Sequence, residues 1–231
     1  MKYIATVFLV VTSTFLVHSQ TYEVGGMIGG ANYIGDVGRT NYIAPNTMAF
    51  GGIFKWNRSP RHSFRASVLI ANIEGDDLNS NQERRQQRGL SFSNTINEIS
   101  LGMEFTFWDF SMYSGKPAGA PYLYTGLTYF WYDALYKRPE DNLIVKYGGA
   151  SDIAIPMVVG YKTSLANRFV LGFEIGARYT FTDDLDGSNP VRDKEEFDML
   201  KFGNTNSDDW YVFTGITLTV TFGRKPCYCN F

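Results

Sequence analysis

Few residues in this chain of 231 are of the types that perform nucleophilic or acid–base catalysis. The chain has two histidines, His18 and His62, and its two cysteines both lie in the last five residues. A serine nucleophile needs a histidine base that a carboxylate orients. His18 falls in an expected signal peptide, which leaves His62 without a convincing serine and carboxylate arrangement. We therefore expect no enzymatic activity and no cofactor.

Several aspartates occur in polar stretches that could offer oxygen ligands to calcium. Runs of aspartate with asparagine and glycine are also typical of solvated loops, and we favour that interpretation. The aspartates concerned are Asp76, Asp77, Asp183, Asp184 and Asp186.

The C-terminal tail, residues 223–231, contains Cys227 and Cys229 and is expected to lie in the periplasm. A disulfide between them would close a small, strained ring, and two thiolates alone make an incomplete metal site. In an oxidising compartment the pair suits a disulfide bond to another protein. The alternative, a frayed tail with incidental thiols, stays open.

The N-terminal segment has the features of a secretory signal peptide, residues 1–19. Lys2 precedes an apolar stretch, Tyr3–Val17, and small residues lead to an expected cleavage near Ser19–Gln20. No later segment approaches 18 uninterrupted apolar residues. A membrane location would therefore require a closed β-barrel.

Alternation of apolar and small or polar residues predicts β-strands. In Trp210–Phe222, the even positions Ile216, Leu218, Val220 and Phe222 oppose Gly215 and the threonines at 217, 219 and 221. Eight segments have strand character: Thr21–Gly30, Thr47–Trp56, Ser63–Glu74, Thr95–Asp109, Pro121–Asp133, Asp152–Leu165, Arg168–Thr182 and Trp210–Phe222.

The connections between these segments alternate in length. Those at 31–46, 75–94, 134–151 and 183–209 are long, whereas those at 57–62, 110–120 and 166–167 are shorter. Membrane barrels alternate long outside loops with short periplasmic turns. With an aromatic content of 16%, we expect an all-β, eight-stranded antiparallel up-and-down transmembrane barrel over residues 20–222. A soluble β-sandwich is the alternative, and the net charge of −2 gives no argument for nucleic acid binding.

Charged residues fall on the expected inner faces of the strands. An unpaired charge in a narrow lumen would be costly, so we expect carboxylate–guanidinium networks. One interpretation is a gated pore. We favour structural packing, because eight strands leave room only for side chains. The residues are Arg65, Glu98, Glu104, Glu174 and Arg178.

The segment Glu23–Asp36 resembles the opening of the PorG family, the outer-membrane barrel component of the Bacteroidota type IX secretion system. The shared pattern is a glycine-rich strand followed by Asn-Tyr-x-Gly-Asp, here Asn32, Tyr33, Gly35 and Asp36. The resemblance extends through Asn97–Glu104 and into the tail.

This resemblance implies a location in the cell outer membrane and association with the periplasmic ring of the lipoprotein PorK and of PorN (GldK and GldN in gliding species). It also implies a part in protein export, contacts with other secretion-system components, gliding motility in some species and no catalysis. The alternative is a small barrel of the OmpA type that acts as an adhesin or surface-binding protein through its outside loops.

Overall fold

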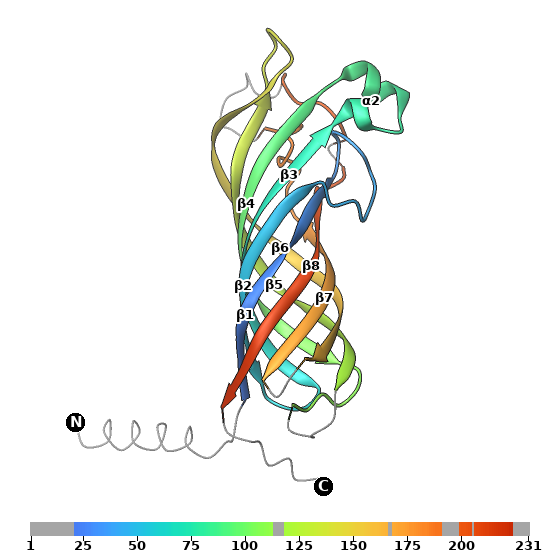
Figure 1. Cartoon of the computed structure of the whole chain (residues 1–231). Helices are drawn as coiled ribbons and strands as arrows, with labels where there is room; N and C mark the ends of the chain where they lie inside the picture. Colours follow the sequence, from blue (N-terminus) through green and yellow to red (C-terminus); the bar gives the residue numbers. More distant parts are fainter. Residues whose placement is uncertain (1–20, 113–117, 166–167, 191–198, 205, 224–231) are drawn as a thin grey trace, which may run out of the picture.

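The computed structural model describes residues 21–112, 118–165, 168–190, 199–204 and 206–223. Eight antiparallel strands form a closed barrel in which each strand pairs with its sequence neighbours and β1 closes on β8 (Figure 1). The predicted eight-stranded up-and-down antiparallel barrel is therefore confirmed. The strands are β1 (Thr21–Ile34), β2 (Thr47–Asn57), β3 (His62–Asp76), β4 (Ser91–Thr106), β5 (Gly119–Lys137), β6 (Ile144–Ser164), β7 (Phe169–Thr180) and β8 (Trp210–Gly223).

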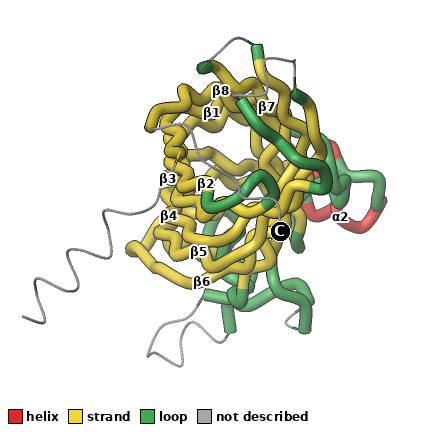
Figure 2. The backbone as a smooth tube through the Cα atoms, turned by 90° about the horizontal axis from the view of Figure 1, so that it is seen from below, coloured by secondary structure: helices red, strands yellow, loops and turns green. Residues whose placement is uncertain are grey.

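Both ends of the strand sequence lie at one end of the barrel, because Thr21 of β1 pairs with Gly223 of β8. We call this the turn end, and Figure 2 views the closed ring of strands from it. The opposite end, which carries connections 35–46, 77–90, 138–143 and 181–209, is the loop end. The predicted signal peptide, the turn at 166–167 and tail residues 224–231 lie outside the described residues.

Burial in the barrel is the reverse of burial in a soluble protein. On β4, Glu98, Ser100 and Glu104 are buried, whereas the alternating Leu101 is 61% exposed. On β7, Glu174 and Arg178 are buried and Phe173 is half exposed. Since successive side chains of a strand point to opposite faces, the barrel has a polar interior and an apolar exterior, as a lipid-facing barrel requires.

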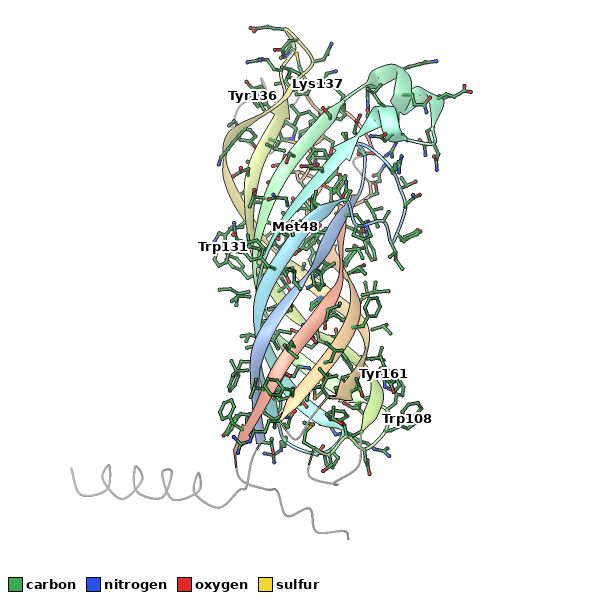
Figure 3. All side chains as sticks on the ribbon, in the orientation of Figure 1. Met48, Trp108, Trp131, Tyr136, Lys137 and Tyr161 are labelled. Atoms are coloured by element: carbon green, nitrogen blue, oxygen red, sulfur yellow. The ribbon has the colours of Figure 1, made fainter. Side chains whose placement is uncertain are left out.

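The apolar exterior forms a band that ends in aromatic residues. Figure 3 shows Met48 and Trp131 at one level and Trp108 and Tyr161 near the turn end. Most outward positions between these levels carry exposed aliphatic or aromatic side chains. They include Val24, Ile28, Phe50, Phe54, Val68, Ile99, Leu101, Leu127, Ile155, Val159, Phe173, Ile216 and Leu218.

Several strands are longer than a membrane crossing requires. A tilted transmembrane strand needs about 9–11 residues, but β5 has 19 and β6 has 21. β4 and β5 stop pairing at Asn97 and Trp131. Beyond that pair the β3–β4 and β5–β6 hairpins continue past the band (Figure 1). They form a raised platform at the loop end.

Three of the long loops expected from the sequence are shorter in the structure, because the strands on either side extend into them. Residues 134–151 were expected to be a long loop, but strand pairing continues to Lys137 and resumes at Ile144. The connection is therefore only residues 138–143, closed by the Arg138 amide donating to the Leu143 carbonyl at 2.8 Å. β1 likewise extends to Ile34, and β3 and β4 extend into the expected 75–94 loop. Hairpin strands can lengthen through polar sequence because each residue adds ladder hydrogen bonds.

The connection between β3 and β4 is short and helical. It contains the 3₁₀ turn η1 (Asp77–Asn79) and the helix α2 (Glu83–Arg88). Asp76 caps η1 by accepting from the Leu78 amide at 2.9 Å, and Gly89 ends α2 with a positive φ of 64°. Within the described residues, no helix is both long and apolar enough to cross a membrane.

The assigned faces predict the cost of placing a charge on the exterior. Leu101→Arg and Phe173→Arg should each lower the free energy of unfolding in lipid by about 2–4 kcal/mol, because their side chains face the bilayer core. Ser93→Arg, on the same face of β4 but above the band, should cost about 0–1 kcal/mol. Denaturant titration in bilayers measures all three. Equal losses at Leu101 and Ser93 would contradict the assigned band.

Candidate functional site

The turn-end half of the lumen contains a connected group of ion pairs. Glu104 accepts a hydrogen bond from Lys162 at 2.7 Å and forms an ion pair with Lys55 at 2.7 Å. Arg65 forms a two-pronged pair with Glu174 at 2.7 and 2.9 Å, and its Nη1 lies 4.0 Å from Glu104. These residues come from β2, β3, β4, β6 and β7. The group therefore ties the walls of the barrel together across its interior.

A second ion pair lies nearer the loop end. Arg178 donates to Glu98 at 2.8 Å through Nη2 and at 3.3 Å through Nε. The Tyr211 hydroxyl donates to the same carboxylate at 2.6 Å. Arg178 also donates to the Gly176 carbonyl at 2.9 Å. Charge-assisted hydrogen bonds of this kind satisfy most of the polar atoms of the pair without water.

The charges buried in the described strands balance. Four are cationic and four are carboxylates, and each of these residues is no more than 3% exposed. Glu23 has no cationic partner but accepts from Asn57 at 2.8 Å and from Thr219 at 2.9 Å. The set is Glu23, Lys55, Arg65, Glu98, Glu104, Lys162, Glu174 and Arg178.

All five lumen residues proposed from the sequence lie in this network, but three members were missed. Phe50 and Phe54 point outward, so alternation places Lys55 on the opposite, inward face of β2. Val159 and Tyr161 point outward in the same way, which places Lys162 on the inward face of β6. Extending the alternation along β2 and β6 would have placed both lysines inside. Glu23 opens a glycine-rich strand in which the alternation is weak.

The remaining lumen space is filled by side chains. Tyr122 donates to Glu174 at 2.8 Å, and a Cβ at Gly160 would lie 2.4 Å from the Tyr122 ring. Towards the loop end, Phe130, Phe213 and Leu185 are fully buried and form an apolar layer above the ion pairs. The arrangement favours structural packing over a gated pore.

The Asn-Tyr-x-Gly-Asp segment holds the first connection at the loop end. The Asn32 side chain donates to the Asn41 carbonyl at 3.1 Å and accepts from the Ala44 amide at 3.2 Å. Asp36 accepts from the Asn204 amide at 2.8 Å. The segment thus joins the end of β1 to the connection between β7 and β8.

Tyr33 and Gly35 make a close contact with the start of β8. The Tyr33 hydroxyl forms a short hydrogen bond with the Asp209 carboxylate. A Cβ at Gly35 would overlap both the Tyr33 hydroxyl and that carboxylate. Glycine at this position therefore permits the close approach.

Five carboxylates gather around this contact, and we call them the acidic cluster: Asp36, Asp183, Asp184, Asp186 and Asp209. Asp186 accepts from the Val37 and Ser188 amides at 3.0 and 2.9 Å, and Asp209 accepts from the Leu185 amide at 3.0 Å. Three of the four carboxylate oxygens of Asp183 and Asp184 lack a well-aligned hydrogen bond. The Asn189 side chain nevertheless lies close enough to Asp183, and Tyr147 close enough to Asp184, to lower the pKa of each carboxyl.

Burial and mutual repulsion raise the pKa values of the cluster. The pKa of Asp183 rises to about 7 and that of Asp184 to about 8, first because burial disfavours the charged form and then because Asp186 is nearby. Burial also raises the pKa values of Asp186 and Asp209. The shifts are opposite in direction to those expected for carboxylates paired with cations.

The expectation that these aspartates lie in solvated loops is wrong. Asp77, Asp184 and Asp186 are buried, because the platform and the 181–190 segment fold over the mouth of the barrel. Asp77 accepts from Arg88 at 2.7 Å and from the Gly38 amide at 2.9 Å. Among the described residues, no group of three or more histidine, cysteine, aspartate or glutamate side chains is placed to hold a metal ion.

His62 lies at the turn end and is exposed. Its Nδ1 is 3.2 Å from the Ser59 hydroxyl, and its ring packs on Phe105. The nearby Asp109 binds Arg61 at 2.6 Å. Cys227 and Cys229 lie outside the described residues.

The comparisons with known proteins establish the family of the chain. It belongs to the DUF6089 family, a domain of unknown function, whose model matches residues 1–231. No curated protein matches the chain.

Three solved structures are similar to the barrel. They are Ail, the attachment invasion locus protein of Yersinia pestis (7% identity, 88% of this chain and 99% of that chain, TM-score 0.48), the N-terminal β-barrel domain of Pseudomonas aeruginosa OprF (11%, 89% and 98%, 0.45) and a major outer membrane protein of Thermus thermophilus (17%, 89% and 100%, 0.44). At these identities and TM-scores the likenesses carry no argument about function.

The ion pairs predict unequal costs for two arginine substitutions. Arg65→Ala should lower the free energy of unfolding by about 3–5 kcal/mol, because it leaves Glu174 buried without its cation. Arg61→Ala removes an equally short pair, at 2.6 Å, but both side chains are more than half exposed, so its cost should be below about 1 kcal/mol. Denaturant titration measures both. The double variant Arg65→Met/Glu174→Met should recover most of the loss, and an unrecovered double variant would count against charge pairing as the cause.

Proposed function

We propose that this member of the DUF6089 family is a non-enzymatic outer-membrane component of the type IX protein secretion system. In this proposal it anchors or assembles the periplasmic ring formed by the PorK lipoprotein and PorN (GldK and GldN in gliding species). The observation that carries the proposal is the resemblance of Glu23–Asp36, with Asn32, Tyr33, Gly35 and Asp36, to the PorG family.

The interior of the barrel supports an anchoring role over a conducting one. Ion pairs and aromatic rings occupy the lumen, and Phe130, Phe213 and Leu185 close it towards the loop end. A barrel without a conduit contributes to export by holding other components at the membrane. The band of exposed apolar side chains supports a membrane location.

The turn end would present the ring-binding surface. Its described connections expose charged groups, among them Arg58 and the Arg61–Asp109 pair. Gly223, where β8 ends, lies at this end of the barrel, and in this proposal the tail that follows it offers Cys227 and Cys229 to a periplasmic subunit. A covalent or non-covalent contact with a periplasmic subunit would form there.

The proposed orientation can be measured with two matched cysteine variants. In a Cys227→Ser/Cys229→Ser background, Gln87→Cys in α2 should react with a membrane-impermeant maleimide on intact cells. Arg58→Cys at the turn end should react only after the outer membrane is permeabilised. Both positions are exposed, so accessibility within the fold does not distinguish them. The reverse labelling pattern would mean that the barrel is inverted.

The proposed partner can be tested by purification from the native membrane. Affinity-tagged protein should retrieve the ring lipoprotein and its partner subunit, and cells lacking the barrel should secrete type IX substrates poorly. Retrieval without these subunits, together with normal secretion in the deletion strain, would refute the proposal.

The tail cysteines can be tested separately. On non-reducing gels of freshly alkylated cells, the protein should migrate as an adduct that dithiothreitol removes and that a Cys227→Ser/Cys229→Ser variant lacks. The barrel of the variant should still fold, because both cysteines follow β8. Identical migration of variant and wild type would refute the intermolecular disulfide. A non-covalent anchor would then be decided by the purification test.

A surface-binding barrel is the second candidate, and the raised platform favours it. The β3–β4 and β5–β6 hairpins and α2 hold polar and aromatic residues beyond the apolar band (Figure 3). Replacing residues 80–89 with a short glycine-rich turn should abolish surface binding but leave secretion intact if this candidate is right. Loss of secretion in that variant would instead tie the platform to export.

A further inference from the structure

The acidic cluster joins two connections that have no strand pairing with each other. Asp36 belongs to the 35–46 connection, whereas Asp183, Asp184, Asp186 and Asp209 belong to the β7–β8 connection. The contacts across the boundary are the Val37 amide to Asp186, the Asn204 amide to Asp36 and the Tyr33 hydroxyl to Asp209. Each of these contacts has a carboxylate on one side. The closed arrangement therefore depends on the state of the cluster.

The cations that α2 and β5 bring close to the cluster are engaged elsewhere. Arg88 is the nearest cation from α2, but it pairs with Asp77 and reaches only the main-chain carbonyl of Asp36, at 2.6 Å. Lys137 lies over the Phe202 ring. The other titratable groups that face the cluster are neutral hydroxyls or further acids: Tyr33 from β1, Tyr132 from β5, Tyr147 from β6 and Asp208 beside Asp209.

Burial makes ionisation of the whole cluster costly. Asp183 is 8% exposed and Asp184 is 2% exposed, and three of their four carboxylate oxygens lack a well-aligned hydrogen bond. The groups that approach them, the Asn189 side chain and Tyr147, carry no positive charge. A buried carboxylate without a partner is stable only when it is protonated or when it moves to water. The second route requires segment 181–190 to leave the mouth of the barrel.

We propose that residues 181–190 form a proton-controlled latch, which closes over the mouth when the acidic cluster holds protons and opens when the cluster ionises. In the closed state Leu185 seals the lumen, and the neutral carboxyl groups of Asp183 and Asp184 tolerate burial. In the open state these side chains reach water, and the contacts of Asp186 with the Val37 amide and of the Leu185 amide with Asp209 break. The latch changes which surface the loop end presents, so it goes beyond the proposed anchoring role.

The direction of the pH dependence follows from the raised pKa values. In the closed latch the pKa of Asp183 is raised to about 7 and that of Asp184 to about 8, whereas the ordinary pKa of an aspartate is 3.8. The open form therefore binds fewer protons between about pH 4 and pH 8, and the closed form loses stability as pH rises through that window. Above about pH 8 no further change comes from these two groups.

The test is a distance measurement between spin labels on the two connections. Tyr42→Cys and Met199→Cys carry the labels, because their side chains are 76% and 84% exposed, in a Cys227→Ser/Cys229→Ser background with a metal chelator present. Met199 reports on the latch because the Phe202 amide, in the same segment, donates to the latch carbonyl of Ser188 at 2.8 Å. A single short distance is expected at pH 5 and a growing population of longer distances towards pH 9. Since release of one proton shifts an equilibrium about tenfold per pH unit, the open-to-closed ratio should rise at least about tenfold.

Two comparisons separate the latch from general loosening of the loop end. Asp183→Asn/Asp184→Asn should keep the short distance at both pH values, because an amide cannot ionise. Asp141→Asn, an exposed aspartate of the 138–143 connection, should leave the pH response unchanged. A reference pair at Tyr42 and Leu78, both outside the latch, should not change with pH.

The outcomes decide the proposal. The same distance distribution at pH 5 and pH 9 in the wild-type background overturns it, as does a pH response that persists in the double asparagine variant. If the double variant does not form a barrel, judged by its gel mobility before and after boiling, each single asparagine variant should still shift less per pH unit than the wild type. An unchanged shift in both single variants also overturns the proposal.

Discussion

Pairing of charge inside a lipid-surrounded barrel is the constraint on which the rest of the structure depends. Removing a carboxylate or guanidinium from water costs several kcal/mol unless a partner compensates it. The lumen meets this requirement with equal numbers of buried cations and carboxylates drawn from β1, β2, β3, β4, β6 and β7. β2, β3, β4, β6 and β7 must therefore adopt the registers that bring their charges together. The ion pairs thus act against slippage of the strands, which the hydrogen-bonded ladders alone would permit.

The exterior imposes the complementary requirement. Each strand pairs with a neighbour on both sides, because the barrel closes between β1 and β8, so the sheet has no open edge in the membrane. The outward side chains then need only be apolar, and aliphatic and aromatic residues fulfil that along each strand. Only part of β5 and part of β6 are needed to pack the lumen and to cover the outside with apolar side chains. The remaining residues of these strands form the raised platform.

The loop end follows a different electrostatic rule. Its buried carboxylates lie on connections rather than on strands, and the described cations near them are engaged elsewhere. A paired lumen holds one arrangement over a wide pH range, whereas an unpaired acidic cluster has a stability that changes with protonation. One molecule therefore combines a rigid, closed barrel with a segment over its mouth whose position depends on charge. That combination suits a membrane anchor whose outward-facing surface can change without opening the membrane.

Much of this structure can be predicted from the alternation of residue types along single strands. The parity of Glu98 to Thr106 and of Val170 to Thr180 assigned inner and outer faces without a fold, because side chains of a strand must alternate. The contrast of long and short connections likewise predicted the up-and-down order. The same alternation, extended along β2 and β6, would also have predicted that Lys55 and Lys162 face the lumen.

Only the tertiary structure determines which buried charges pair with each other and how the connections at the loop end fold. No spacing in the sequence links Arg65 to Glu174 or Arg178 to Glu98, because those pairs form across the barrel and depend on strand register. The platform was missed because its strands reverse the polarity of the membrane band: Ile73, Phe92 and Ile96 are buried, whereas the exposed positions that alternate with them are polar. The acidic stretch 183–186 has the composition of a solvated loop. It is buried because the barrel closes β8 against β1 and so brings Asp209 and Tyr33 to the same mouth, a contact that only the closed fold creates.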